Sequence, residues 1–298
     1  MLEIKKFGAI DIGSNAIRLL ISNVVIKEGK EPQFKKSSLV RVPIRLGADA
    51  FVNGIISPEN TIRMINAMQA FKLLMKVHNV EHYKACATSA MREAKNGIEI
   101  VKKIFDETGV EIQVIGGKEE AAIISSTDLN ELISSDSSYL YVDVGGGSTE
   151  FTVFSGGKII TSKSFKMGTV RLLNNKKSVN KEIFANVEKW VKKNTKDLKN
   201  LSLIGSGGNI NKLFKMSGRT EGKPISFIYL NAQYEFLKQM TYQERISELS
   251  LNPDRADVII PATKIYLSAM KWSGARKIYV PKIGLSDGII KSLYYNKL

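Results

Sequence analysis

The chain has 298 residues, a formal net charge of +15, 43% hydrophobic residues and 24% charged residues. This composition is typical of a soluble globular protein that is long enough for two domains, each with its own core. No apolar run approaches the roughly 20 residues that span a bilayer, and no signal-peptide core follows Met1, so we expect a cytoplasmic protein without a membrane partner. Cys86 is the only cysteine, which excludes an intramolecular disulfide and Cys-rich zinc sites.

The excess of lysine favours a polyanionic ligand. Lysines concentrate in residues 27–36, 158–166 and 176–199, and such segments attract nucleic acid, an acidic membrane surface or a long phosphate polymer. A solvated basic face is the structural alternative. The basic residues are not interleaved with aromatic residues in the way that stacks nucleic-acid bases, so nucleic acid is not an expected partner.

The first half of the chain opens with three strand-like runs and then alternates helices with strands. The apolar patterns predict strands at Phe7–Ile12, Ile17–Ile26 and Gln33–Leu46, a long helix from Pro58, a strand at Tyr83–Ala87, a helix at Met91–Thr108 and a strand at Glu111–Ile115.

A helix at Lys118–Ile133 leads into the second half, which repeats this opening. We expect strands at Tyr139–Val144, Glu150–Ser155 and Lys158–Phe165, with Gly156–Gly157 as a hairpin turn. After them we expect a helix at Lys181–Leu198, a strand at Leu201–Ile204, a helix at Asn209–Met216, helical stretches through Ser273, a strand at Lys277–Val280 and a last helix at Asp287–Tyr295. The residues Ser217–Ile225 are the expected flexible loop.

Two glycine-rich turns follow the first strand of each half, at Asp11–Asn15 and at Asp143–Glu150. In each, an Asp ends the strand, and small residues then let backbone N–H groups approach a ligand. A single turn of this kind is commonly a plain connection. Because the turn occurs once in each half, we interpret both as phosphate-binding turns whose Asp can hold a hydrated divalent cation.

Antiparallel hairpins that lead into parallel crossovers, occurring twice, predict two α/β domains. We expect two actin-like (ribonuclease H-like) domains, each a mixed five-stranded sheet flanked by helices, which face each other across a cleft with one turn on each wall. The expected boundaries are residues 1–123 and 124–298, with the last helix, 286–298, as a candidate to pack back on the first domain. This is the plan of the actin-like ATPase and sugar-kinase superfamily.

Within that superfamily the chain resembles the exopolyphosphatase and guanosine-pentaphosphate phosphohydrolase (Ppx/GppA) family over essentially its whole length. Five motifs in order carry the resemblance: Ala9–Leu19, Ala87–Asn96, Ile115–Ala121, Asp143–Glu150 and Gly205–Gly208. The resemblance implies hydrolytic release of the terminal phosphate from inorganic polyphosphate, an exopolyphosphatase activity, by Mg²⁺-assisted in-line attack of a water. It also implies guanosine penta- or tetraphosphate as an alternative ligand and a homodimer as a possible assembly. Chemistry of this type needs a positioned water and neutralised charge on the phosphate oxygens.

The resemblance assigns the general base to Glu120, the second Glu of a pair at the start of a helix, whereas Glu119 points elsewhere. An ordinary helix-start acid is the alternative for Glu120. Arg92 is the second catalytic candidate, as a bidentate clamp on phosphate oxygens. The metal candidates are Asp11, Asp143 and Glu150, although a turn-capping role is open for both Asp residues. The phosphate-binding candidates are Gly13, Ser14, Asn15, Arg18, Gly145, Gly146, Gly147, Ser148, Gly207 and Gly208.

Two departures from the family pattern leave nucleotide contacts open. Asn209 stands where the family usually has Thr, and Lys282–Gly288 has no Arg where many members carry one. The alternatives to an exopolyphosphatase are a guanosine pentaphosphate 5′-phosphohydrolase, a sensor that binds a guanosine alarmone, and a small-molecule kinase or ATPase. The Glu-Glu-Ala motif that begins at Glu119 disfavours a kinase, and the high positive charge favours the polymer over a nucleotide.

Overall fold

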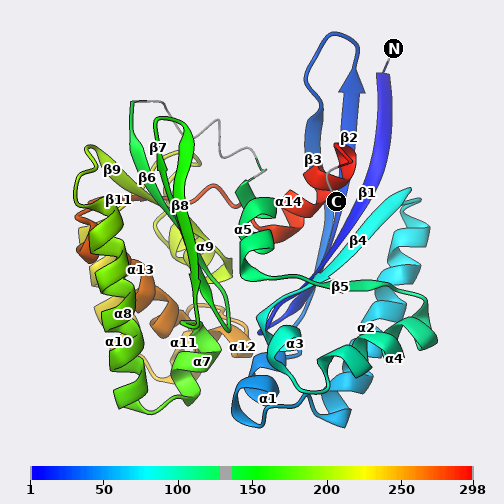
Figure 1. Cartoon of the computed structure of the whole chain (residues 1–298), viewed down its shortest axis with the longest axis horizontal. Coiled ribbons are helices and arrows are strands. Elements are labelled where there is room, and N and C mark those ends of the chain that lie inside the picture. The colour runs from blue at the N-terminus through cyan, green and yellow to red at the C-terminus, as the bar shows by residue number, and fades with distance from the viewer. Residues whose placement is uncertain (1, 126, 128–135, 297–298) are drawn as a thin grey trace. The chain divides into compact units, whose positions relative to one another are not determined.

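The computed structural model describes residues 2–125, 127 and 136–296. The chain forms two compact units (Figure 1): the first comprises Met1–Thr127 together with Leu285–Leu298, and the second comprises Asp128–Gly284. The division therefore falls after Thr127 instead of after residue 123, and the last helix is part of the first unit. In the described part of the chain, no helix is both long and apolar enough to cross a membrane.

The first unit is built on a mixed sheet of five strands, as the sequence predicts, and their order in the sheet is β3-β2-β1-β4-β5. Strands β1 (Leu2–Ile12), β2 (Ile17–Lys27) and β3 (Gln33–Val42) form an antiparallel meander. Strands β4 (His82–Ala87) and β5 (Ile112–Val114) extend the sheet parallel to β1. The helices of this unit are α1 (Leu46–Val52), α2 (Pro58–Val77), α3 (Ser89–Glu93), α4 (Gly97–Thr108), α5 (Gly117–Ser125) and α14 (Leu285–Tyr294).

Side chains alternate between the two faces of this sheet, and the apolar ones on one face pack against helix α2. Ile10 and Leu19, on paired positions of β1 and β2, join Met68 and Phe71 of α2 in the hydrophobic core. Helix α2 begins where the Ser57 hydroxyl accepts the N–H of Asn60, with Pro58 in the first turn. Figure 1 shows α2 and α4 on one face of the sheet and α5 and α14 on the other.

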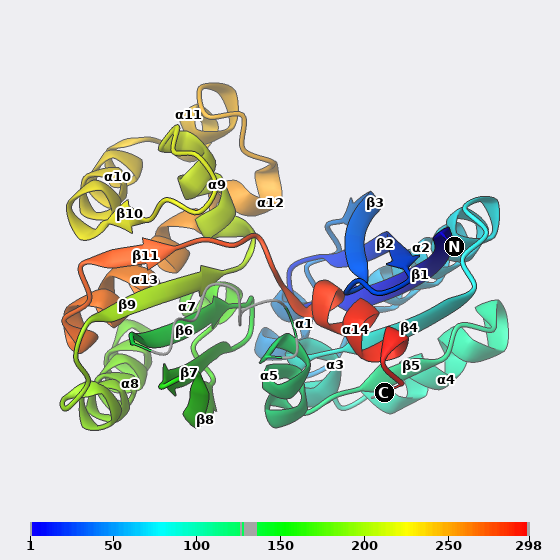
Figure 2. The same ribbon diagram turned by 90° about the horizontal axis from the view of Figure 1, so that it is seen from above.

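The second unit carries a six-stranded sheet in the order β10-β11-β9-β6-β7-β8, which Figure 2 shows from above. Its strands are β6 (Ser138–Val144), β7 (Thr149–Ser155), β8 (Lys158–Phe165), β9 (Leu201–Ser206), β10 (Ile225–Ser226) and β11 (Lys277–Tyr279). Its helices are α7 (Thr169–Asn174), α8 (Lys177–Thr195), α9 (Gly208–Met216), α10 (Phe227–Gln239), α11 (Tyr242–Ser247), α12 (Pro253–Ala256) and α13 (Ile259–Ser273).

The internal repeat is confirmed. Strands β6, β7 and β8 form an antiparallel meander, and β9 and β11 continue the sheet parallel to β6, as β4 and β5 do beside β1. The hairpin turn at Gly156 and Gly157 is also confirmed, with φ angles of 58° and 73° that favour glycine. The sixth strand was not expected. Ile225, the last residue of the segment predicted as a loop, and the following Ser226 pair antiparallel with β11 and form an edge strand.

Several predicted helices differ in detail. The helix expected at Met91–Thr108 is two helices, because Ala94 has extended backbone and ends α3. Asn96, the residue before α4, accepts a hydrogen bond of 2.9 Å from Ile56 N–H and donates one of 2.8 Å to Ile56 O. The short helices α1 and α7 were not predicted. The helix expected at Lys118–Ile133 is α5, which ends at Ser125, and most of its remaining residues lie outside the described part of the chain.

Helices α5 and α14 pack closely on each other within the first unit. A Cβ atom placed on Gly288 of α14 would lie 2.3 Å from the carbonyl oxygen of Ile123 on α5, a distance that real Cβ atoms do not adopt. Because the opposing atom belongs to the backbone, a side-chain rotation cannot relieve the overlap. The glycine therefore fixes the approach of α14 to the helix that carries Glu119 and Glu120.

We expect Gly288→Ala to destabilise the protein by about 1–3 kcal/mol through overpacking against α5. The measurement is a urea-unfolding midpoint or a thermal melt of the two proteins. Gly284→Ala is the matched control, because a Cβ at Gly284 would meet no described atom within 4 Å. Equal losses in the two variants would contradict the close α5–α14 contact as the cause.

Candidate active site

The predicted site residues of the first unit lie at the carboxyl ends of its three parallel strands. Asp11 and the first glycine-rich turn follow β1, Arg92 lies on α3 just after β4, and Glu120 lies on α5 just after β5. Hydrogen bonds join these three segments: Thr88 N–H donates to Ile12 O over 3.1 Å, and Ile115 N–H donates to Ala87 O over 2.9 Å. Ligands of α/β proteins bind at this edge of a parallel sheet.

The first turn presents its amide groups outward. Gly13 N–H donates to Ala16 O over 3.2 Å and closes the turn. The carbonyl oxygens of Ser14 and Asn15 accept the N–H groups of Gly47 and Arg45, at the start of α1. Because C=O and N–H point in opposite directions across a trans peptide plane, the following amides, those of Asn15 and Ala16, point away from α1. This arrangement suits an anion.

Ser89 takes part in this turn, and sequence reasoning did not single it out. Its hydroxyl and that of Ser14 share a hydrogen bond of 2.9 Å, and both residues are buried. The bond ties the turn after β1 to the start of α3, the helix that carries Arg92. The signal in the sequence was the Thr-Ser-Ala run before Arg92, but nothing in that run identified Ser14 as its partner.

Asp11 forms an ion pair with Arg18 inside the first sheet. The two residues are directly opposed on β1 and β2, and Arg18 Nη1 donates to Asp11 Oδ2 over 2.7 Å. The Asp11 side chain is only 6% exposed, so the guanidinium neutralises a buried carboxylate. Arg41 on β3 is the next residue in the same cross-strand row. The predicted phosphate clamp Arg18 is thus anchored by the predicted metal ligand Asp11.

Glu120 lies in the first turn of α5, and its N–H donates to Gly116 O over 2.9 Å. One of its carboxylate oxygens, Oε2, is buried. Glu119 faces a different neighbour, since its Oε1 accepts a hydrogen bond of 2.8 Å from Gln113 on β5. Arg92 Nη1 donates to Ile115 O over 2.6 Å, which holds the guanidinium at the loop that begins α5.

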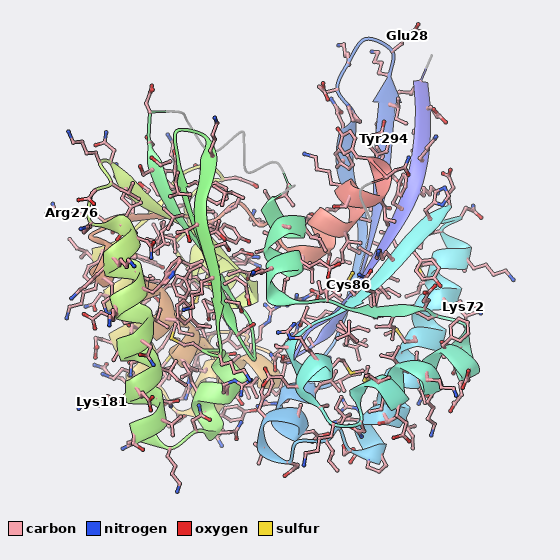
Figure 3. The ribbon with its side chains drawn as sticks, viewed as in Figure 1. Glu28, Lys72, Cys86, Lys181, Arg276 and Tyr294 are labelled. Atoms are coloured by element: carbon pink, nitrogen blue, oxygen red, sulfur yellow. The ribbon has the colours of Figure 1, made fainter. Side chains whose placement is uncertain are left out.

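Cys86 reports the charges that gather at this edge. It lies on β4 (Figure 3) and is paired in register with Asp11 on β1. Burial raises the pKa of the Cys86 thiol to about 12, and the negative charges of Asp11, Glu119 and Glu120 contribute to the rise while Lys84 opposes it. The thiol is therefore protonated at physiological pH.

The second unit repeats this layout at the carboxyl ends of β6, β9 and β11. Gly145 N–H donates to Ser148 O over 3.0 Å and closes the second turn, as Gly13 closes the first. The carbonyl of Gly146 accepts the N–H of Val170 on α7, and that of Gly147 accepts Arg171 Nε over 3.0 Å. The amides of Gly147 and Ser148 therefore point away from α7.

Gly207 brings the β9 end close to the second turn. Its φ of 115° is in the region that favours glycine, and a Cβ there would lie 3.0 Å from Val144 O and 3.6 Å from Asp143 Oδ1. Ser206 Oγ donates to Ile283 O over 2.9 Å, which joins the ends of β9 and β11. Gly208, the first residue of α9, lies beside the Arg255 guanidinium, whose Nη2 would be 3.0 Å from a Cβ at this position.

Asp143 and Glu150 are a directly opposed carboxylate pair on β6 and β7. Glu150 is 2% exposed, and its Oε1 accepts hydrogen bonds of 2.7 Å from both Ser148 and Ser164. Two hydroxyl donors on one oxygen stabilise negative charge there. Two directly opposed carboxylates repel each other when both are charged. A cation at this pair would relieve that repulsion.

This donor set fits Mg²⁺. The ion prefers oxygen ligands, and protein sites commonly supply one or two carboxylates while waters and phosphate oxygens complete the octahedron. Among the described residues there is no group of three or more His, Cys, Asp or Glu side chains that could hold a metal, so a two-carboxylate site is the relevant comparison. Ser164 was not predicted as part of this site, because only the pairing of β7 with β8 places it beside Glu150.

The structure thus distributes the predicted site residues over the two units. The first unit brings together Asp11, Gly13, Ser14, Asn15, Arg18, Arg92 and Glu120, and the second brings together Asp143, Gly145, Gly146, Gly147, Ser148, Glu150, Gly207 and Gly208. Of the three predicted metal ligands, Asp143 and Glu150 are neighbours, whereas Asp11 belongs to the other unit and is paired with Arg18.

Curated relatives match over most of the chain. A bifunctional 3-dehydroquinate synthase/phosphatase of Fusobacterium nucleatum is 31% identical over 301 residues, which cover 92% of this chain and 44% of the relative. This chain therefore spans less than half of that protein. Exopolyphosphatase 2 of Mycobacterium tuberculosis is 26% identical over 320 residues, which cover 98% of this chain and 99% of the relative.

Solved structures share the fold. An exopolyphosphatase from Cytophaga hutchinsonii superposes with a TM-score of 0.86 at 23% identity and covers 98% of both chains. The Ppx/GppA family member of Aquifex aeolicus gives a TM-score of 0.78 at 24% identity and covers 99% of both chains. The model of the Ppx/GppA phosphatase family matches residues 25–297. With two repeated α/β units and a match over nearly its whole length, the chain belongs to the Ppx/GppA phosphatase family.

Proposed function

We propose that this protein is an exopolyphosphatase, which releases the terminal phosphate of inorganic polyphosphate by attack of water. The observation that carries the proposal is the placement of Glu120. Its carboxylate lies in the first turn of α5, at the carboxyl edge of the first sheet, where the Arg92 guanidinium is held by Ile115 O at 2.6 Å. A base and a phosphate-binding cation are then contributed by adjoining segments of one unit.

In this proposal the first unit binds the terminal phosphate and activates the water. The outward amides of the first turn and the guanidinium of Arg92 donate hydrogen bonds to the phosphate oxygens. Glu120 takes a proton from the water as the water oxygen bonds to the terminal phosphorus. The bond from that phosphorus to the bridging oxygen breaks, and the bridging oxygen stays on the shortened chain as a terminal phosphate oxygen.

Asp143 and Glu150 are the residues that we propose hold Mg²⁺ in the second unit. Their direct opposition on β6 and β7 and the two serine hydroxyls on Glu150 support this assignment. The ion, when bound, supplies positive charge to phosphate oxygens during the transfer. The outward amides of Gly147 and Ser148 can donate further hydrogen bonds to phosphate oxygens.

Three observations favour the polymer over guanosine pentaphosphate as the substrate. The net charge of +15 attracts a long anion more strongly than a nucleotide. The segment Lys282–Gly288 lacks the Arg that many members carry, and Lys282 pairs with Glu221 at 3.2 Å. Relatives named as exopolyphosphatases match the chain over nearly its full length. Guanosine pentaphosphate hydrolysis, or binding of a guanosine alarmone without hydrolysis, is the alternative function.

The experiment that tests the substrate is phosphate release from long-chain polyphosphate, guanosine pentaphosphate and ATP, each with Mg²⁺ titrated from zero. We expect polyphosphate to be degraded to orthophosphate, with a Michaelis constant that falls with chain length and rises with salt, because the attraction is electrostatic. Faster hydrolysis of guanosine pentaphosphate would support the alternative. Rapid turnover of ATP while polyphosphate stays intact would identify an ATPase or kinase instead.

We expect Glu120→Gln to lower the turnover number by about two or more decades, the effect of removing a general base. The matched control is Glu119→Gln, because Glu119 is the preceding residue of the same helix and its carboxylate bonds Gln113. This control should retain turnover within about threefold, a factor below 1 kcal/mol in barrier height. If Glu120→Gln keeps the turnover of the native protein, the base lies elsewhere.

A further inference from the structure

The two glycine-rich turns are closed by equivalent hydrogen bonds, but the charged residues on the neighbouring strands differ. In both units the turn is closed by the same hydrogen bond, Gly13 to Ala16 in the first and Gly145 to Ser148 in the second. In both, the strand-terminal Asp is directly opposed by a residue of the next strand. That residue is Arg18 opposite Asp11 in the first unit and Glu150 opposite Asp143 in the second.

The same contrast continues one strand further. Arg18 is paired in register with Arg41 on β3, whereas Glu150 is paired with Ser164 on β8. On the other side of the Asp, the parallel neighbours are the uncharged Cys86 and Ser206. The row in the first unit, from Arg41 through Asp11 to Cys86, therefore carries two guanidinium groups and one carboxylate. The row in the second unit, from Ser164 through Asp143 to Ser206, carries two carboxylates and no guanidinium group.

We propose that Arg18 is a built-in cation, which takes beside Asp11 the place that a divalent ion takes beside Asp143. The observed Nη1–Oδ2 distance of 2.7 Å shows that the guanidinium already neutralises Asp11. A divalent ion at this position would meet one carboxylate and two guanidinium groups in a row, and their charge repels it. The protein then binds one divalent ion, in the second unit, and Asp11 is not a metal ligand.

This inference rests on the proposed function only for the role of the ion in the second unit. It also assigns different tasks to the two turns. The first unit, with two guanidinium groups beside its turn, is suited to an anion, and the second, with two carboxylates, is suited to a cation. The motifs around Asp11 and Asp143 are alike and predict the same role for both residues, and only the strand register distinguishes them.

The test is the number of Mn²⁺ ions bound, measured by electron paramagnetic resonance of free Mn²⁺ during titration. We expect one ion for the native protein and one for Asp11→Asn, but none for Asp143→Asn. Arg18→Glu combined with Arg41→Ser gives the first row the charges of the second. We expect this double variant to bind a second ion, and to bind one ion when Asp143→Asn is added. Arg18→Gln combined with Arg41→Ser is the control and should bind one.

A folded double variant that binds one ion only, or a native protein that binds two, would overturn the inference. A native protein that binds no Mn²⁺ would contradict the proposed metal site, whereas a first-row double variant that gains an ion would still support the equivalence of the two rows. If Arg18→Glu prevents folding, Glu150→Arg provides the converse test. We expect it to bind no ion and to melt at a higher temperature than Glu150→Ala in a chelator, because it recreates the Asp–Arg pair. Equal melting temperatures would then overturn the inference.

Discussion

The placement of a carboxylate at the end of the first strand in each sheet is the constraint on which the site depends. Each carboxylate is followed by a turn whose carbonyl groups are engaged by the start of a short helix, and this directs the turn's amides the other way. A buried or half-buried carboxylate beside an anion-binding turn needs a compensating positive charge. The first unit supplies that charge with Arg18, and we propose that the second obtains it from a divalent ion.

The different compensation of the two carboxylates lets the two similar units take different roles in the proposed reaction. Two α/β units with the same strand order provide two equivalent edges at the carboxyl ends of parallel strands. We propose that the residue opposite the strand-terminal Asp, on β2 or β7, decides whether the edge binds an anion or a cation. The other side chains that lie at each edge differ as well. The first has Arg92 and Glu120 on neighbouring segments, whereas the second has hydroxyls from Ser148 and Ser164 on its buried carboxylate.

The sequence predicted the repeated strand order and the location of both turns, because strand residues in each half are apolar and are followed by an Asp and glycines. It did not predict the short helices α1 and α7, whose few residues carry no clear helical period, or the two-residue strand β10. The partners of the site residues were also inaccessible. Ser89 and Ser164 are distant in sequence from the residues they contact, and the Asp11–Arg18 pair depends on strand register, which a sequence pattern does not specify.

The central claim is that water attacks the terminal phosphorus of the chain. Hydrolysis of polyphosphate in ¹⁸O-labelled water, followed by mass spectrometry of the products of a single turnover, tests it most directly. The account predicts one ¹⁸O atom in each released orthophosphate and none in the shortened chain. Label in the shortened chain would place the attack on the next phosphorus, and unlabelled orthophosphate would show that water is not the nucleophile. Either result would contradict the role assigned to Glu120.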